Sequence, residues 1–360
     1  MSGASSVAGT WVVAGSPGAL VELAPLIAAR RARGPVLEWS GDVAALLASP
    51  DVYLPPDTAG LLVVADRRRS PGRMLPGLFV GLADGRRVPV GWLPEVVDSG
   101  GPRGRGGPGG QFAESTASTR STGSTQPAPA LATYARAAAT ILERSTSDRT
   151  FVVLGQWEDR FLRVGLRTAR WLERHGHADT RVLWTADRIA RSDMISGLRL
   201  GPAVAVYFGH GRPRGWAGYH GVRREHFYGP WPEPVGALVA LCCENASRLR
   251  TGLSFAEQLV LAGVCGGMMA AVSKTRHEDN RRWGPELCEA FTERQPATLA
   301  ELVEATRVPE PLKRTTVYRF IGDPLIPLAG AEGASARARQ VFAPAPDEAL
   351  PPWEPLSVAQ

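Results

Sequence analysis

Short apolar runs of strand character alternate along this chain with amphipathic stretches of helical period, and this alternation restricts the fold more than any other feature. Ala203–Phe208 and Ala237–Leu241 are examples of the apolar runs, and Arg160–His175 is an amphipathic stretch. Such alternation is typical of βαβ units, in which helices connect parallel strands. We therefore predict an α/β fold with a mostly parallel sheet flanked by helices on both faces.

The same patterns predict the individual elements. Strands are expected at Thr10–Ala14, Gly60–Ala65, Leu78–Gly81, Thr150–Leu154, Thr180–Trp184, Ala203–Phe208, Ala237–Leu241 and Gly267–Val272. Helices are expected at Leu20–Arg33, Asp42–Ala48, Leu131–Arg144, Arg160–His175, Ser254–Ala262, Pro285–Arg294 and Leu299–Thr306.

One low-complexity segment interrupts this pattern. Within Ser99–Pro129, 21 of 31 residues are Gly, Ser, Thr or Pro, and Phe112 is the only large apolar residue. Such a segment cannot bury enough apolar surface to offset its ordering entropy, so we expect a flexible inserted loop. The expected organisation is an N-terminal α/β subdomain at 1–98, the loop at 99–129, a second subdomain at 130–329 and a peripheral tail at 330–360.

Composition and charge exclude several function classes. The net charge of +6 comes from arginines spread over the chain, and the longest basic run is only Arg67–Arg69. We therefore expect no nucleic-acid partner. No apolar run reaches 18 residues, so we expect no membrane span. The first residues lack a basic leader, which predicts a cytoplasmic protein. Four cysteines without CxxC spacing indicate neither a disulfide framework nor a zinc site, and we expect no cofactor.

Two predicted strands end in residues that could carry chemistry. Ala203–Phe208 runs directly into Gly209-His210-Gly211, and Ala237–Leu241 runs into Cys242-Cys243-Glu244-Asn245. Open α/β folds build their sites at the carboxyl ends of their strands. If the two strands are neighbours, the imidazole can take the proton of a thiol that attacks a carbonyl carbon.

The order of these motifs resembles the gingipain-type branch of the caspase-like cysteine peptidases, which share a caspase-haemoglobinase fold. The resemblance covers about residues 60–328, and Gly209–Gly211 and Gly322-Asp323-Pro324 are its most specific parts. Further similar segments are Val88–Pro94 (with Trp92 in place of an Arg), Leu131–Arg144, Leu253–Glu257 and Phe320–Leu325. The resemblance implies a thiol endopeptidase whose catalytic subdomain is 130–329, with protein substrates and a His/Cys dyad.

The resemblance also implies roles for single residues. Cys243 fits the family's nucleophile position better than Cys242, and only one of two adjacent strand residues can face His210. The backbone N–H groups of Gly211 and Cys243 are the expected oxyanion donors. Glu158 is the candidate acid that orients the catalytic His. Candidate specificity-pocket residues are Asp159, Trp216 and Trp283, which would favour cleavage after Arg, or after Lys.

Two alternatives and one control element complete the expectations. Glu158 and Asp159 could instead only cap the helix Arg160–His175, and the chain could be a catalytically inactive caspase-like scaffold that binds protein partners.

A cytoplasmic endopeptidase must be restrained, so a regulatory role in signalling or defence and a zymogen form are expected. Cleavage of the inserted loop, by the enzyme itself or by an upstream activating protease, would occur at Arg103, Arg105 or Arg120.

Overall fold

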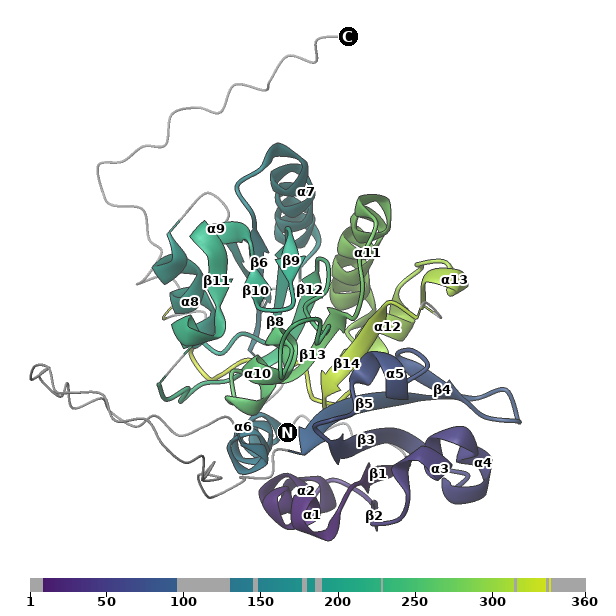
Figure 1. Ribbon diagram of the computed structural model, residues 1–360. Helices are drawn as coiled ribbons and strands as arrows, with labels where there is room; N and C mark the ends of the chain where they lie inside the picture. Colours follow the sequence, from purple (N-terminus) through teal and green to yellow (C-terminus); the bar gives the residue numbers. More distant parts are fainter. Residues whose placement is uncertain are drawn as a thin grey trace, which may run out of the picture.

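A single eleven-stranded sheet forms the centre of the protein in the computed structural model, which describes residues 9–95, 130–144, 148–176, 180–184, 190–227, 229–313, 316–334 and 337 (Figure 1). The strand order is β2-β1-β3-β5-β14-β13-β12-β8-β6-β7, and β4 pairs with β5 outside this path. The strands are β1 Thr10–Ala14, β2 Val36–Trp39, β3 Thr58–Asp66, β4 Phe79–Gly81, β5 Arg87–Glu95, β6 Arg149–Gly155, β7 Thr180–Trp184, β8 Val204–Phe208, β12 Val235–Leu241, β13 Cys265–Ala271 and β14 Tyr318–Gly322.

The sheet consists of two parallel blocks. Strands β2, β1, β3, β5 and β14 run parallel to one another, and so do β13, β12, β8, β6 and β7. The blocks meet at the antiparallel pair β13–β14. Consequently, β6, β8, β12 and β13 all have their carboxyl ends at one edge. The predicted mostly parallel α/β fold is confirmed.

Helices flank this sheet (Figure 1). They are α1 Pro17–Glu22, α2 Ala24–Arg31, α3 Val43–Ala48, α4 Pro50–Tyr53, α5 Pro71–Met74, α6 Leu131–Glu143, α7 Asp159–His175, α8 Arg191–Arg199, α9 Gly218–Gly221, α10 Phe255–Leu261, α11 His277–Glu289, α12 Leu299–Ala305 and α13 Glu310–Lys313. A 3-10 helix η1 spans Arg224–Phe227, and a π-helical segment η2 spans Ala290–Arg294. A small antiparallel sheet, called the ribbon below, contains β9 Gly211–Arg212, β10 Gly215–Trp216 and β11 Val222–Arg223.

Two expected helices differ from the observed ones. The stretch Leu20–Arg33 forms two helices that join at Leu23, because Pro25 lies in the first turn of α2, where a missing N–H costs least. The helix expected to begin at Pro285 begins at His277 and contains that proline. Its first two turns carry many charged side chains on an exposed face, which made them resemble a solvated loop.

The sheet is buried on both faces where the two blocks meet. All seven residues of β12 and all seven of β13 are buried, as expected for strands covered on both sides. This rigid centre fixes the loops that follow β6, β8, β12 and β13. No helix within the described ranges combines the length and the apolar character that a membrane crossing needs.

Residues from both ends of the chain complete the core at the block boundary. The buried Asp323 carboxylate accepts hydrogen bonds from Nε of Arg30 at 2.9 Å and from Nη2 at 2.5 Å. It also accepts one from the indole N–H of Trp11 at 3.3 Å. The Gly322-Asp323-Pro324 segment therefore ties β1 and α2 to β14.

Candidate active site

His210 and Cys243 lie at corresponding positions beyond two neighbouring strands. Strands β8 and β12 pair in parallel, and the register places Leu241 opposite Phe208. His210 lies two positions after Phe208, and Cys243 lies two positions after Leu241. Adjacent strands are about 4.8 Å apart, so this register brings the imidazole and the thiol to the same edge. The expected pairing of the two strands is observed.

The glycines on both sides of His210 are required by close packing. A Cβ atom on Gly209 would lie 2.3 Å from the Tyr207 hydroxyl, and one on Gly211 would lie 2.2 Å from the carbonyl oxygen of Cys243. Neither position can hold a larger residue without displacing its neighbour. The Gly-His-Gly motif therefore allows the loop after β8 to approach the Cys243 backbone.

Charged groups from the loop after β6 surround the His210 side chain. Oε2 of Glu158 lies 3.5 Å from Nε2 of His210, and Nη2 of Arg160 lies 2.5 Å from the same nitrogen. Arg160 also contacts Glu158, with Nε 2.5 Å from Oε1. A guanidinium can only donate, so Nε2 is the acceptor in this contact. Oε1 of Gln156 accepts a hydrogen bond from the His210 backbone N–H at 2.8 Å.

A polar loop after β13 surrounds the Cys243 sulfur. The Thr275 backbone N–H donates to Sγ at 3.4 Å, and the Thr275 hydroxyl is also 3.4 Å from it. Asn280 holds this hydroxyl by donating to it at 3.1 Å. In the described part of the chain the backbone N–H of Cys243 makes no hydrogen bond, so it is available for an oxyanion.

Cys242 occupies a different environment from its neighbour. Its side chain is buried, and its thiol donates to Oδ1 of Asn245 at 2.7 Å. Burial, together with the nearby Cys243, raises the pKa of Cys242 well above its ordinary value. Cys243 is only half-buried. Of these two adjacent cysteines, Cys243 is the one that solvent and substrate can reach.

Asn245 joins the loop after β12 to the ribbon. Its side-chain amide donates to the carbonyl oxygens of Arg212 at 2.9 Å and Gly215 at 3.2 Å. Its Oδ1 also accepts the indole N–H of Trp216 at 2.6 Å. Trp216 in turn stacks on Tyr207, with ring centroids 4.3 Å apart. Asn245 thereby holds the loops that carry His210 and Cys243 in a fixed relation.

The three candidate specificity-pocket residues lie in three different environments. Trp216 contributes to a cavity beside the ribbon, although little of its side chain is exposed. Trp283 is completely buried in α11 and packs on Tyr318, so it cannot form the accessible pocket wall that we expected. Asp159 is 77% exposed in the first turn of α7, 4.0 Å from Arg163. It does not reach the base of a pocket and instead complements the positive end of the helix.

Sequence reasoning missed several residues in and around the candidate pair. Thr275 contacts Cys243, Arg160 contacts His210, and His277 lies next to them; none carries a motif, and they reach the site only through the fold. Phe161 packs edge-on against the rings of both His210 and His277, with centroid distances of 5.2 and 5.6 Å. Burial and the nearby Arg160 and Arg281 lower the pKa of His277. The signal that could have found them is their position in the loop after β13 or in the first turns of α7 and α11, which follow β6 and β13.

Comparison with known families identifies the class of enzyme. Residues 157–329, just under half of the chain, match peptidase family C25, and they contain His210 and Cys243. This segment belongs to the gingipain-type cysteine peptidases. By family the chain is a cysteine peptidase, as the sequence motifs indicated. No curated protein has a sequence that matches this chain.

Solved structures show the same fold over most of this peptidase. The structure of the Arg-specific cysteine proteinase gingipain R has a TM-score of 0.63 and 14% identity, covering 90% of this chain and 79% of its own. The complex of pro- and mature domains of Porphyromonas gingivalis RgpB gives 0.60 and 14%, covering 89% and 80%. A third structure, described as a protease, gives 0.59 and 12%, covering 89% and 78%. These similarities confirm the caspase-like fold.

Proposed function

We propose that this peptidase cleaves internal peptide bonds by attack of the Cys243 sulfur on the scissile carbonyl carbon. The observation that carries the proposal is the β8–β12 register, which brings His210 and Cys243 to one edge. His210 takes the thiol proton and later delivers it to the leaving amine, while the sulfur forms an acyl-enzyme that water then hydrolyses. The N–H groups of Cys243 and Gly211 bind the developing oxyanion.

Fluorogenic peptides test this proposal directly. A panel with Arg, Lys, Asp or Leu before the scissile bond is assayed with the wild type and with Cys243→Ala. Hydrolysis by the wild type and its loss in Cys243→Ala are expected. A wild-type protein that cleaves none of the peptides would instead support a catalytically inactive scaffold.

We further propose a preference for Arg, and then Lys, before the cleaved bond. Two observations support it: the similar gingipain R structure is described as Arg specific, and Glu158 holds a guanidinium beside His210 in this chain. Arg160 supplies that guanidinium, and a substrate arginine could replace it at the same carboxylate. In the peptide panel, a preference for Asp or for small apolar residues would contradict this assignment.

We also propose that the segment 99–129 controls activity through cleavage, which would make the uncut chain a zymogen with a regulatory role. Arg103, Arg105 and Arg120 lie outside the described residues, so the support is their composition and their place between β5 and α6. Replacing all three with Ala and comparing activity before and after limited proteolysis tests the proposal. Full activity of the uncut triple variant would exclude such control.

A cytoplasmic location is proposed together with this role. The four cysteines are all free in the structure, which fits a reducing compartment. Fractionation of cells that express a tagged chain tests the location. Recovery of the protein outside the cell would overturn it.

A further inference from the structure

A basic cavity begins directly beside the candidate catalytic pair. It has a volume of about 850 Å³ and lies between the ribbon and the loops after β12 and β13. We call it the ribbon cleft. Arg212 follows His210 by two positions, and Glu244 and Lys274 are the chain neighbours of Cys243 and Thr275. A peptide bound at Cys243 would therefore lie next to this cavity.

The charge of the ribbon cleft is strongly one-sided. Its basic lining residues are Arg212, Arg214, Arg223, Arg250 and Lys274, and its only acidic one is Glu244. None of the five basic side chains forms an ion pair with any residue that the structure describes. In the whole chain the balance is 41 basic to 35 acidic residues, so the excess in the cleft is local.

The ribbon register explains why two of these arginines face an open hollow. Arg212 on β9 and Arg223 on β11 both pair with Gly215 on the middle strand, so all three positions share one face. Gly215 adds no side chain between them. A Cβ atom there would lie 1.9 Å from the carbonyl oxygen of Val222, which restricts the position to glycine.

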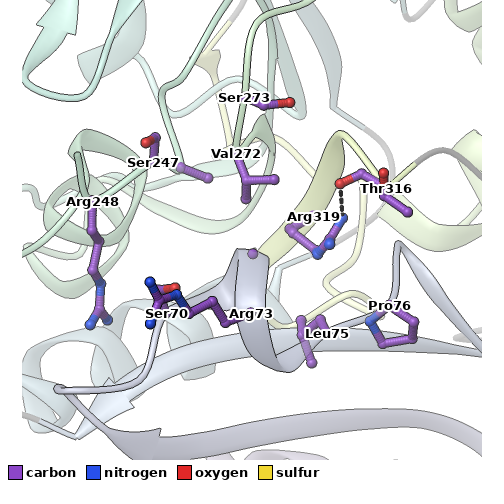
Figure 2. A pocket seen from close by; sticks show the side chains of 12 residues that line it. Ser70, Arg73, Leu75, Pro76, Ser247, Arg248, Val272, Ser273, Thr316 and Arg319 are labelled. Atoms are coloured by element: carbon purple, nitrogen blue, oxygen red, sulfur yellow. Dashed lines mark hydrogen bonds between the residues drawn. The ribbon is translucent and has the colours of Figure 1, made fainter.

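A second basic cavity, of about 580 Å³, lies between α5 and β14. We call it the junction cleft. Figure 2 shows that Arg73, Arg248 and Arg319 enter it from three separate segments, and none of the described residues that line it is acidic. Glu257 neutralises Arg248, whereas Arg319 donates hydrogen bonds to the carbonyl oxygens of Pro71, Thr316 and Tyr318. Burial lowers the pKa of Arg319 to about 10.

The two clefts lie on either side of the same two loops. Ser247 and Arg248 line the junction cleft, and the next residues, Leu249 and Arg250, line the ribbon cleft. Likewise, Ser273 lines the junction cleft and Lys274, the next residue, lines the ribbon cleft. Both loops continue from strands that end at the candidate active site. An extended peptide advances about 3.3 Å per residue, so its side chains near the cleaved bond can reach both clefts.

We propose that this peptidase selects protein segments with several Asp or Glu side chains within a few residues of the cleaved bond, and that the two clefts bind their carboxylates. The inference rests on the proposed peptidase function and adds the class of substrate. The acidic side chains of the substrate lie on either side of the residue that precedes the cleaved bond. That residue itself binds at Glu158. Unpaired arginines bind such carboxylates and attract an acidic chain from a distance.

A binding experiment tests the inference without requiring turnover. The Cys243→Ala protein is titrated into two fluorescein-labelled ten-residue peptides that contain one central Arg and four flanking Glu or four flanking Gln residues. Anisotropy is measured at low and at physiological salt. We expect the Glu peptide to bind at least about tenfold more tightly at low salt, and the difference to shrink as salt shortens the Debye length to about 8 Å.

Matched variants locate the binding surface. Arg214→Glu with Arg223→Glu reverses two exposed charges in the ribbon cleft, and Arg73→Glu reverses one in the junction cleft. Arg167→Glu with Arg170→Glu makes the same charge change as the first pair on the exposed face of α7. Binding of the Glu peptide should fall about tenfold in the ribbon pair, severalfold in Arg73→Glu and less than twofold in the α7 pair.

Three outcomes would overturn the inference. The first is equal binding of the Glu and Gln peptides at low salt. The second is an equal loss in the α7 pair, which would show an effect of net charge alone. The third is a single-stranded oligonucleotide of the same charge that binds more tightly than the Glu peptide and depends on the same arginines. Absence of peptide hydrolysis by the wild type, with acidic binding intact, would overturn only the proposed function.

Discussion

The sulfur of Cys243 is accessible, whereas those of the other three cysteines are buried. Burial raises the pKa of Cys242, Cys265 and Cys288, so their thiols stay protonated near pH 8. Alkylating reagents attack the thiolate. Brief iodoacetamide treatment of the native protein should therefore add one group, at Cys243, as read by peptide mass spectrometry. Cys242→Ala should retain activity while Cys243→Ala and His210→Ala lose it. Alkylation of Cys242 first would contradict the choice of nucleophile.

Glu158 is the residue that we expect to support the His210 imidazolium during catalysis. Its carboxylate lies 3.5 Å from Nε2, and a negative charge there stabilises the cation that forms when His210 takes the thiol proton. Glu158→Gln should lower kcat about five- to tenfold, as expected for the loss of one partly exposed charge pair worth about 1 kcal/mol. The pH profile of kcat should change as well. Glu173→Gln, on the exposed face of α7, is the matched control and should change neither.

At the scale of elements, α10 begins with a capping box that also joins three parts of the chain. Ser254 and Glu257 exchange hydrogen bonds at its first turn, and Glu257 also accepts the Trp92 indole N–H at 2.9 Å and pairs with Arg248. Ser254→Ala should cost about 1 kcal/mol of unfolding free energy. Glu257→Gln should cost more, about 3 kcal/mol, because the buried carboxylate loses its charge and the largely buried Arg248 loses its partner.

Urea unfolding measures both costs. Thr298→Ala removes the N-cap of α12, which caps only its own helix, and is the control for a simple capping loss of about 1 kcal/mol. Equal losses in Glu257→Gln and Thr298→Ala would show that the Arg248 pair contributes nothing beyond the cap.

The sequence predicted those elements whose pattern is uninterrupted and missed those in which local and tertiary preferences disagree. Strands β1, β6, β8, β12 and β13 carry continuous apolar runs and were expected. Strand β5 contains Pro89 and Pro94, which remove ladder donors and hide the strand, although β3 and β14 pair with it. The ribbon strands are two residues each, too short for any periodicity.

The same distinction applies to the candidate site. His210 and Cys243 could be predicted because each follows a recognisable strand, and Glu158 because it follows a third. Thr275 could not, since its contact with the sulfur depends on how the loop after β13 folds over the edge. Trp283 was misplaced because a tryptophan that packs in a core and one that lines a pocket have the same local sequence.

At the scale of the whole molecule, the Arg30–Asp323 pair connects the N-terminal part of the chain to the segment that follows β14. Both side chains are buried, and Asp323 receives further hydrogen bonds from Trp11 and from the Leu325 backbone. Asp323→Asn leaves the Arg30 charge buried without its partner and should cost about 3–5 kcal/mol of unfolding free energy. Asp84→Asn, which breaks an exposed pair with Arg86, is the control and should leave the urea midpoint unchanged. A similar midpoint for both variants would contradict a role of Asp323 in joining the N-terminal part of the chain to the segment after β14.

The pairing of β5 with β14 also decides what happens when the chain is divided. The contacts of β5 with β14, α2 with α6 and Arg30 with Asp323 all join a residue before position 96 to one after position 129. None of them depends on a continuous backbone between those positions. Residues 1–98 and 130–360, produced as separate polypeptides, should therefore assemble into a one-to-one complex. Such a split peptidase would be inactive as either fragment and restored on mixing.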